Sequence, residues 1–164
     1  MHIIVLVMLL WIGAPDLVHA AGWTSIAGAE EIATHRAESP EFRERAAKLA
    51  YGTTYDFFYD LETDADYAYV QSFLDRICNM KRPDGTYDFG AMRRVVDSEI
   101  KPYQWRFAFK IVLSHVKREA RAIYLATKDQ HGYELARLYI EATFKGAKAG
   151  LAAARHEHWE RHNH

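Results

Sequence analysis

The residues whose types and spacing could support chemistry are mainly cations. Basic side chains recur on one side of the stretch that follows Pro102, and two tyrosines share that arc. The members are Tyr103, Arg106, Lys110, Lys117, Arg121, Tyr124 and Lys128. Because binding surfaces are enriched in Arg and aromatic residues, this pattern predicts a surface for an acidic partner. The same pattern is also typical of a solvated helix face, or of cations that pair with acids elsewhere in the chain.

Histidines near the C-terminus form a second cluster that could support chemistry. His158 and His162 are four residues apart and would share one face of a helix. Neutral imidazoles at this spacing can bind zinc or copper. The order of residues is not His-Glu-x-x-His, so no metalloprotease base is offered. We favour a solvated, flexible terminus over a metal site, and we expect no cofactor.

Five acids lie close together between residues 56 and 66, and their alternate spacing is similar to that of a calcium loop. They are Asp56, Asp60, Glu62, Asp64 and Asp66. The EF-hand pattern also requires a central Gly and a terminal Glu at fixed positions, and both are missing here. We therefore interpret the segment as a solvated turn between two helices, with Thr63 or Asp64 as the cap of the second helix.

The sequence contains no recognisable motif for nucleophilic catalysis. Cys78 is the only cysteine and has no His near it in the chain. It sits beside Leu74 and Ile77 on an apolar helix face, which favours a buried, inert thiol over an intermolecular bridge. No Gly-rich phosphate loop occurs. The pattern favours a protein that is not an enzyme.

The element that must position the cations is a long helix over residues 103–127. Neither Pro nor Gly interrupts it, and a separate apolar arc runs along it. That arc consists of Trp105, Phe109, Val112, Val116, Ala120 and Ile123. The helix therefore has an apolar stripe for the core and a separate cationic stripe. We expect it to be the long central helix of the fold.

Other helical segments surround this one. We expect a short helix at 23–36, then helices near 40–61, 65–80, 88–100 and 133–155. Ser39 and Pro40 mark the start of the second, whose predicted buried stripe is Phe42, Ala46, Leu49, Thr53, Phe57 and Leu61. Gly146 and Gly150 predict close helix packing. The chain is expected to be all-α, a single bundle of about five helices.

The boundaries of the bundle follow from the two ends of the chain. Residues 1–20 contain an apolar run from Ile3 to Ile12 and a small-residue cleavage site at Val18-His19-Ala20. This is typical of a secretory signal peptide, and a retained membrane anchor is disfavoured because the run is short. We expect the bundle domain at 21–155 and a His-rich flexible tail at 156–164.

Charge is distributed unevenly along the chain. Residues 21–80 contain 5 Lys or Arg and 11 Asp or Glu, whereas residues 81–164 contain 16 and 10. The two halves either neutralise each other across a helix interface or leave a basic face for an acidic partner. Nucleic acid is a poor candidate, because the chain is expected to be secreted and its net charge is −1.

Two segments carry a resemblance to a known family. These are Phe73-Leu74-Asp75-Arg76-Ile77 and, after a short turn, the stretch from Gly85 to Arg94 that reads GTYDFGAMRR. Together with a cysteine-poor helical chain behind a signal peptide, they resemble the gastropod sperm acrosomal proteins, namely the egg-coat lysins and their fusogenic paralogue. The resemblance implies a closed bundle of five helices with two basic tracks, one of them containing Arg93 and Arg94.

The resemblance also implies a function. It implies storage in the sperm acrosomal vesicle, and non-enzymatic binding to the egg vitelline envelope or the egg membrane at fertilisation. The partner would be an extracellular glycoprotein coat or a membrane surface. Those proteins are strongly basic, and this chain departs from them in being neutral. The alternative is a secreted helical carrier or metal-binding protein. A homodimer stays open, because the sequence does not fix the oligomeric state.

Overall fold

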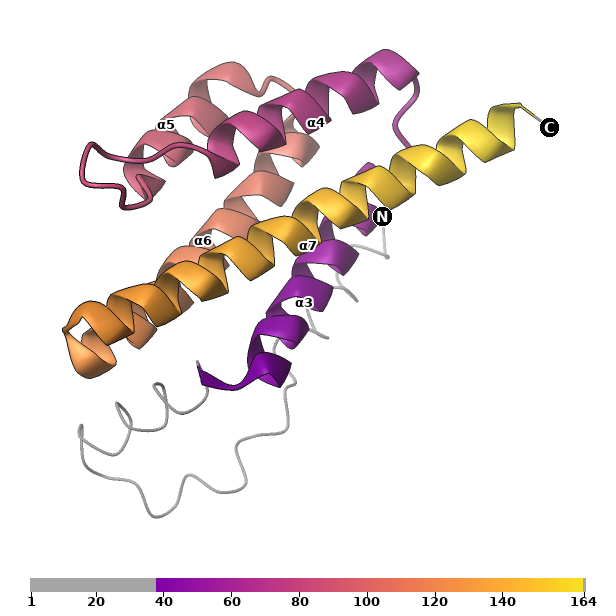
Figure 1. Cartoon of the computed structure of the whole chain (residues 1–164). Helices are drawn as coiled ribbons and strands as arrows, with labels where there is room; N and C mark the ends of the chain where they lie inside the picture. The colour runs from indigo at the N-terminus through magenta and orange to yellow at the C-terminus, as the bar shows by residue number, and fades with distance from the viewer. Residues whose placement is uncertain (1–37, 164) are drawn as a thin grey trace, which may run out of the picture.

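The computed structural model describes residues 38–163. The predicted signal peptide, the predicted helix at 23–36 and His164 lie outside the described residues. Within them the chain is an all-α bundle, as predicted (Figure 1). Its helices are α3 (Pro40–Phe58), α4 (Asp64–Cys78), α5 (Phe89–Glu99), α6 (Tyr103–Thr127) and α7 (Gln130–His162). The described part contains no strand, only a bridge between Lys81 and Tyr87 in the α4–α5 turn.

The long helix at the centre of the bundle is α7 rather than α6. It has 33 residues, against 25 in α6. Helices α3, α4 and α6 all pack against it, while α5 packs on α6 and α4 (Figure 1). We expected the stretch 103–127 to hold this position. Its apolar arc is buried as predicted, with Val112, Val116 and Ala120 in the core. Helix α6 packs against three helices, α3, α5 and α7, as α7 packs against α3, α4 and α6, and α7 is the longer of the two.

Helix starts follow their capping residues closely. The Ser39 hydroxyl accepts a hydrogen bond from the Phe42 amide at 3.4 Å, and Pro40 occupies the first turn. Thr63 caps α4 in a reciprocal capping box with Asp66. The side chains of Asp88 and Asp129 cap α5 and α7 by accepting hydrogen bonds from the amides of Ala91 and Gly132. The predicted starts of α3, α4 and α5 are confirmed by these side chains.

Contact between α3 and α7 is the closest in the bundle. A Cβ placed on Gly146 would lie 2.1 Å from the Ala47 carbonyl oxygen, and one on Gly150 would lie 2.2 Å from the Tyr51 carbonyl oxygen. Neither position can hold a side chain without separating the helices. The buried Thr54 hydroxyl donates a hydrogen bond of 2.7 Å to the Ala147 carbonyl across the contact. The predicted role of the two glycines in helix packing is confirmed.

This contact also corrects the predicted stripe of α3. The residues that α3 buries are Ala46, Ala50, Thr54 and Phe58. Leu49, which we placed on the buried stripe, is 51% exposed, and Thr53 and Phe57 are only partly buried. The reason is steric, because an α7 face containing two glycines brings the α3 backbone so near that small residues fill the contact.

The ends of α7 lie further out than the sequence suggested. The helix begins at Gln130 instead of Tyr133, because Asp129 accepts a hydrogen bond from the Gly132 amide at 2.9 Å. A Cβ on Gly132 would lie 1.8 Å from the Thr127 hydroxyl oxygen, so a larger residue there would force the Thr127 side chain to move. The helix continues to His162 instead of ending near Arg155. The segment expected to be a flexible tail is therefore helical through His162.

Candidate binding surface on α6

The basic stripe on α6 is the row Arg106, Lys110, Lys117, Arg121 and Lys128. Its first two members make contacts within the fold. Arg106 donates two hydrogen bonds, of 3.0 and 2.8 Å, to the Ile100 carbonyl at the end of α5. Lys110 lies 2.5 Å from an Asp97 carboxylate oxygen. This hydrogen bond from Lys110 is the main reason why the pKa of Asp97 lies below its usual range. Arg106 and Lys110 therefore fasten α5 to α6.

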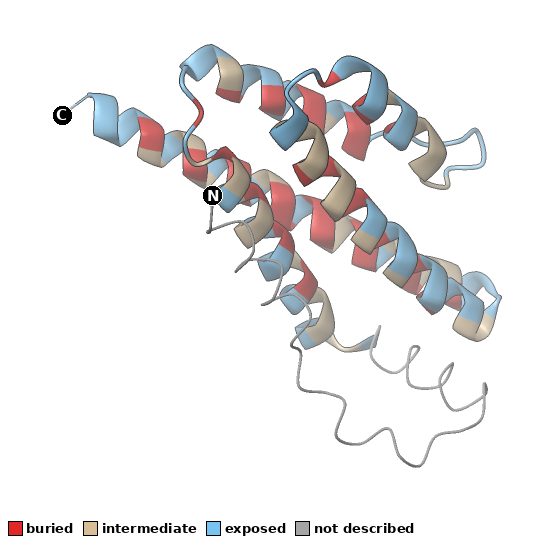
Figure 2. Cartoon of the chain, turned by 180° about the vertical axis from the view of Figure 1, so that it is seen from behind, coloured by how far each residue is buried: buried red, intermediate tan, exposed pale blue. Residues whose placement is uncertain are grey.

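The second half of the stripe faces water. Lys117, Arg121 and Lys128 are exposed, and none of the ion pairs within residues 38–163 includes them. Tyr124 is 43% exposed and lies between Arg121 and Lys128 in the chain. Figure 2, the view from behind, shows exposed residues along the outer side of this part of α6. We call Lys117, Arg121, Tyr124 and Lys128 the α6 cationic surface.

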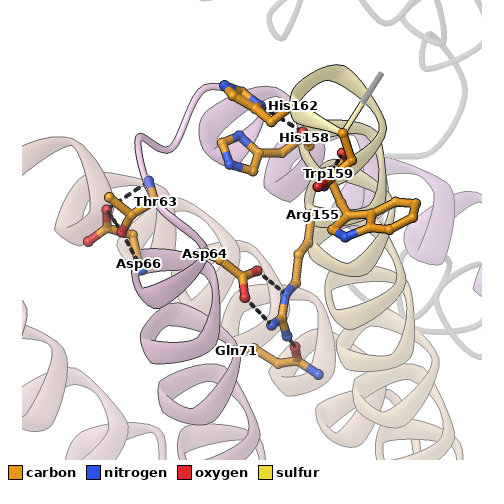
Figure 3. A network of polar contacts seen from close by, with 9 residues as sticks. Thr63, Asp64, Asp66, Gln71, Arg155, His158, Trp159 and His162 are labelled. Atoms are coloured by element: carbon orange, nitrogen blue, oxygen red, sulfur yellow. Dashed lines mark hydrogen bonds and ion pairs between the residues drawn. The ribbon is translucent and has the colours of Figure 1, made fainter.

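The acids between residues 56 and 66 were one possible internal partner of the stripe, and the two of them that form ion pairs, Asp60 and Asp64, do so with α7. Arg155 pairs with Asp64 at 2.9 Å and also donates to Gln71 at 3.1 Å (Figure 3). Arg161 pairs with Asp60 at 3.4 Å. The two charged halves of the chain do neutralise each other, but across α7. The α6 cationic surface takes no part in this neutralisation.

Arg93 and Arg94, the positions implied by the family resemblance, are exposed on α5. Arg93 lies 3.3 Å from the Asp97 carboxylate, which also holds Lys110. Arg93 therefore neighbours the occupied half of the α6 stripe. The structure does not join either arginine to the α6 cationic surface.

Tyr103 lies at the opposite end of α6 from Tyr124 and is 70% exposed. Its ring stacks on Phe107 with centroids 6.2 Å apart, and Phe107 in turn meets the edge of Phe57 on α3 at 6.2 Å. Tyr103 thus belongs to an aromatic row that closes the end of the bundle. It shares the arc of the α6 cationic surface but is separated from it by most of the helix.

The histidine pair is part of the α7 helix. His158 is only 8% exposed, and its ring lies 5.0 Å from that of Tyr67. Its other ring neighbour is His162, at 4.2 Å, on the same helix (Figure 3). The His162 Nδ1 atom lies 2.8 Å from the His158 carbonyl oxygen. Among the described residues, no group of three or more His, Cys, Asp or Glu could hold a metal ion. The pair contributes packing between α7 and α4.

Contacts with α3 also anchor the end of α7. The hydroxyls of Tyr55 and Tyr59 both donate hydrogen bonds to the Glu157 carboxylate. The hydrogen bond between Tyr55 and Glu157 is the main reason why the pKa of Tyr55 rises to about 12. The Arg161 guanidinium lies over the Tyr59 ring, 4.2 Å from its centroid. No local pattern in the sequence indicates these contacts, because the partners are about a hundred residues apart in the chain.

Groups suited to nucleophilic chemistry are not brought together in the described part of the chain. Cys78 is buried as a free thiol, as predicted, and its burial raises its pKa to about 12. His115 lies 3.1 Å from the Tyr139 hydroxyl, and burial lowers its pKa. A small apolar cavity between α3, α4, α6 and α7 is too small for anything larger than one water molecule.

Compared with protein-family models, with curated proteins and with solved structures, the chain shows no match. None of the helices in residues 38–163 combines the length and the apolar character required to span a bilayer. The α6 cationic surface must therefore be interpreted from its own geometry and charge.

Proposed function

We propose that this chain is a secreted, non-enzymatic binding protein whose α6 cationic surface recognises an acidic extracellular partner. One observation carries the proposal. Lys117, Arg121 and Lys128 are exposed and take no part in the ion pairs of the described residues, whereas Lys148, Arg155 and Arg161 of α7 pair with Asp75, Asp64 and Asp60. Aligned, unneutralised charge attracts a partner of opposite sign.

A neutral protein can bind in this way because the attraction is local. The net charge is −1, so the whole molecule is not drawn to anionic surfaces in general. At physiological salt, charges farther away than about 8 Å are largely screened. The cations of one helix face therefore decide which partner is held, and Tyr124 adds an aromatic contact of the kind that binding surfaces enrich.

The resemblance to sperm acrosomal proteins supplies the candidate partner. It points to the egg vitelline envelope, or to the egg membrane, and to storage in the acrosomal vesicle before release. Expression confined to testis, with the protein present in sperm, is the result we expect. Abundant protein in other tissues with none in sperm would remove the reproductive role and leave only the binding surface.

Charge reversal on isolated egg envelopes tests the proposal. The protein expressed from the full sequence is titrated onto envelopes from the species that makes it, with bound protein measured after washing. The double variant Lys117→Glu/Arg121→Glu should bind about tenfold more weakly, because two attractive contacts become repulsive. The matched control is Arg45→Glu/Lys145→Glu, which removes two exposed cations from α3 and α7. Equal binding by both variants would contradict the proposal.

A further inference from the structure

The positions of the cations indicate the shape of the ligand. Along a helix that rises 1.5 Å per residue, Lys117 and Arg121 are about 6 Å apart, and Arg121 and Lys128 are about 10 Å apart. The only acid in α6 is Glu119, which pairs with Arg118 at 3.0 Å. The α6 cationic surface is therefore a row of positive charges about 16 Å long.

A small anion does not fit this arrangement. The three cations stand in a line on the convex outer face of a helix and converge on no common point. One phosphate or sulfate group could contact one of them, or two at most, and would bind weakly in open water. A ligand that engages the whole row must carry negative charges at intervals along an extended chain.

A membrane surface fits less well than a linear polymer. A helix that lies in a membrane interface inserts a continuous apolar face. The apolar face of α6 is buried in the bundle through Val112, Val116 and Ala120. The exposed apolar side chains that remain beside the cations are Tyr124 and Leu125. This area is too small to insert, but a single ring suits a flat ligand segment.

We propose, on the premise of the binding role proposed above, that the α6 cationic surface binds a linear sulfated polysaccharide lying along the helix. Lys117, Arg121 and Lys128 contact successive sulfate groups. Tyr124, one turn after Arg121 and about one turn before Lys128, stacks its ring on the apolar C–H face of a sugar. An acidic peptide would satisfy the cations but offers no such repeating face to the tyrosine.

Size-fractionated heparin fragments are the probe, with binding to the full-chain protein measured by calorimetry. Affinity should rise with fragment length until the fragment spans the row, and then level off. Lys117→Glu/Arg121→Glu should weaken binding at least tenfold, while Arg45→Glu/Lys145→Glu leaves it unchanged. Tyr124→Ala should weaken binding several-fold and Tyr124→Phe should not, because the ring and not the hydroxyl makes the contact.

Three outcomes overturn this assignment. The first is affinity that does not depend on fragment length. The second is an equal loss in both double variants. The third is tighter binding to polyglutamate, to single-stranded DNA or to phosphatidylserine vesicles than to heparin fragments, with the same dependence on Lys117 and Arg121. Any of these results assigns the surface to another class of ligand or to no ligand.

A separate readout distinguishes the two proposals. Egg envelopes are treated with enzymes that remove sulfated glycans, and binding of the unmodified protein is measured again. If binding falls about as far as it does with Lys117→Glu/Arg121→Glu, the polysaccharide is the ligand. If binding depends on the two cations but not on the glycans, the polysaccharide inference fails and the binding role stands. Binding that depends on neither removes both proposals.

Discussion

Two glycines of α7 define the closest packing in the molecule, and they can be tested one residue at a time. In Gly146→Ala the new methyl group would clash with the Ala47 backbone. Backbone cannot yield as a flexible side chain can, so we expect the free energy of unfolding to fall by about 2–3 kcal/mol. Chemical denaturation measures this difference.

Gly52→Ala is the matched control for that substitution. Gly52 lies inside α3, and a Cβ added there would meet nothing within 4 Å. Alanine should therefore raise the free energy of unfolding by about 0.5–1 kcal/mol, through the smaller backbone entropy of the unfolded chain. Destabilisation by Gly52→Ala, or tolerance of Gly146→Ala, would contradict the geometry of the α3–α7 contact.

The thiol of Cys78 gives a second prediction at the residue scale. Burial raises its pKa to about 12, so very little thiolate is present at neutral pH. We expect no reaction with a thiol reagent such as iodoacetamide in the folded protein and complete reaction in denaturant. Rapid labelling of the folded protein, or a covalent dimer on a non-reducing gel, would show that the thiol is accessible.

At the scale of the elements, Arg155 links α7 to the start of α4. The hydrogen bond from Arg155 is the main reason why the pKa of Asp64 lies below its usual range. A carboxyl whose pKa is lowered by folding stabilises the protein above its unfolded pKa, which is about 3.9 for Asp. That contribution is lost as the pH falls through the lower folded value.

Arg155→Ala should therefore destabilise the protein at neutral pH and make little difference at strongly acidic pH. Urea denaturation of both proteins at several pH values measures the change. NMR titration of Asp64 in the variant should show its pKa returning toward that of an ordinary Asp. Arg45→Ala, on an exposed position of α3, serves as the control. A stability difference that stays constant down to acidic pH would exclude the ion pair as its cause.

Sequence reasoning predicted what depends on local chemistry. Ser39, Thr63 and Asp88 start their helices because each side chain satisfies amides of the following turn. The buried arc of α6 also followed from its period. The buried face of α3 could not be predicted in this way. Leu49 is more hydrophobic than Ala50, but the close approach at the α7 glycines buries Ala50 and leaves Leu49 exposed. These glycines are about a hundred residues from α3 in the chain, so no local pattern in α3 indicates its buried face.

The same distinction applies to the candidate site. The sequence placed seven residues on one helical arc, of which six lie within α6 and Lys128 is its C-cap. It could not show that Arg106 and Lys110 are held by α5, nor that Arg155 and Arg161 neutralise Asp64 and Asp60. The pairings of Arg155 and Arg161 join residues about 90 to 100 apart in the chain, and those of Arg106 and Lys110 depend on how α5 packs against α6. Long-range pairing therefore decides which of the cations remain for a partner.

At the scale of the whole molecule, the cations that pair within the bundle lie apart from those that we propose bind a partner. Ion pairs along α7 connect it to α4 and to the turn between α3 and α4, and the pair of Asp97 with Lys110 connects α5 and α6. The outer side of the second half of α6 stands apart from both groups. Since exposed charges are screened by salt, binding through this side should weaken steeply as salt rises, while stability should change little.

The most direct test of the binding surface is the reactivity of its lysines. The protein is mixed with egg envelopes, treated briefly with an acetylating reagent and analysed by mass spectrometry, with unbound protein as the reference. Lys145, exposed on α7, is the internal control. We predict that the envelope protects Lys117 and Lys128 several-fold while Lys145 reacts as before. Equal reactivity of all three lysines in bound and unbound protein would contradict the assignment of the binding surface to α6.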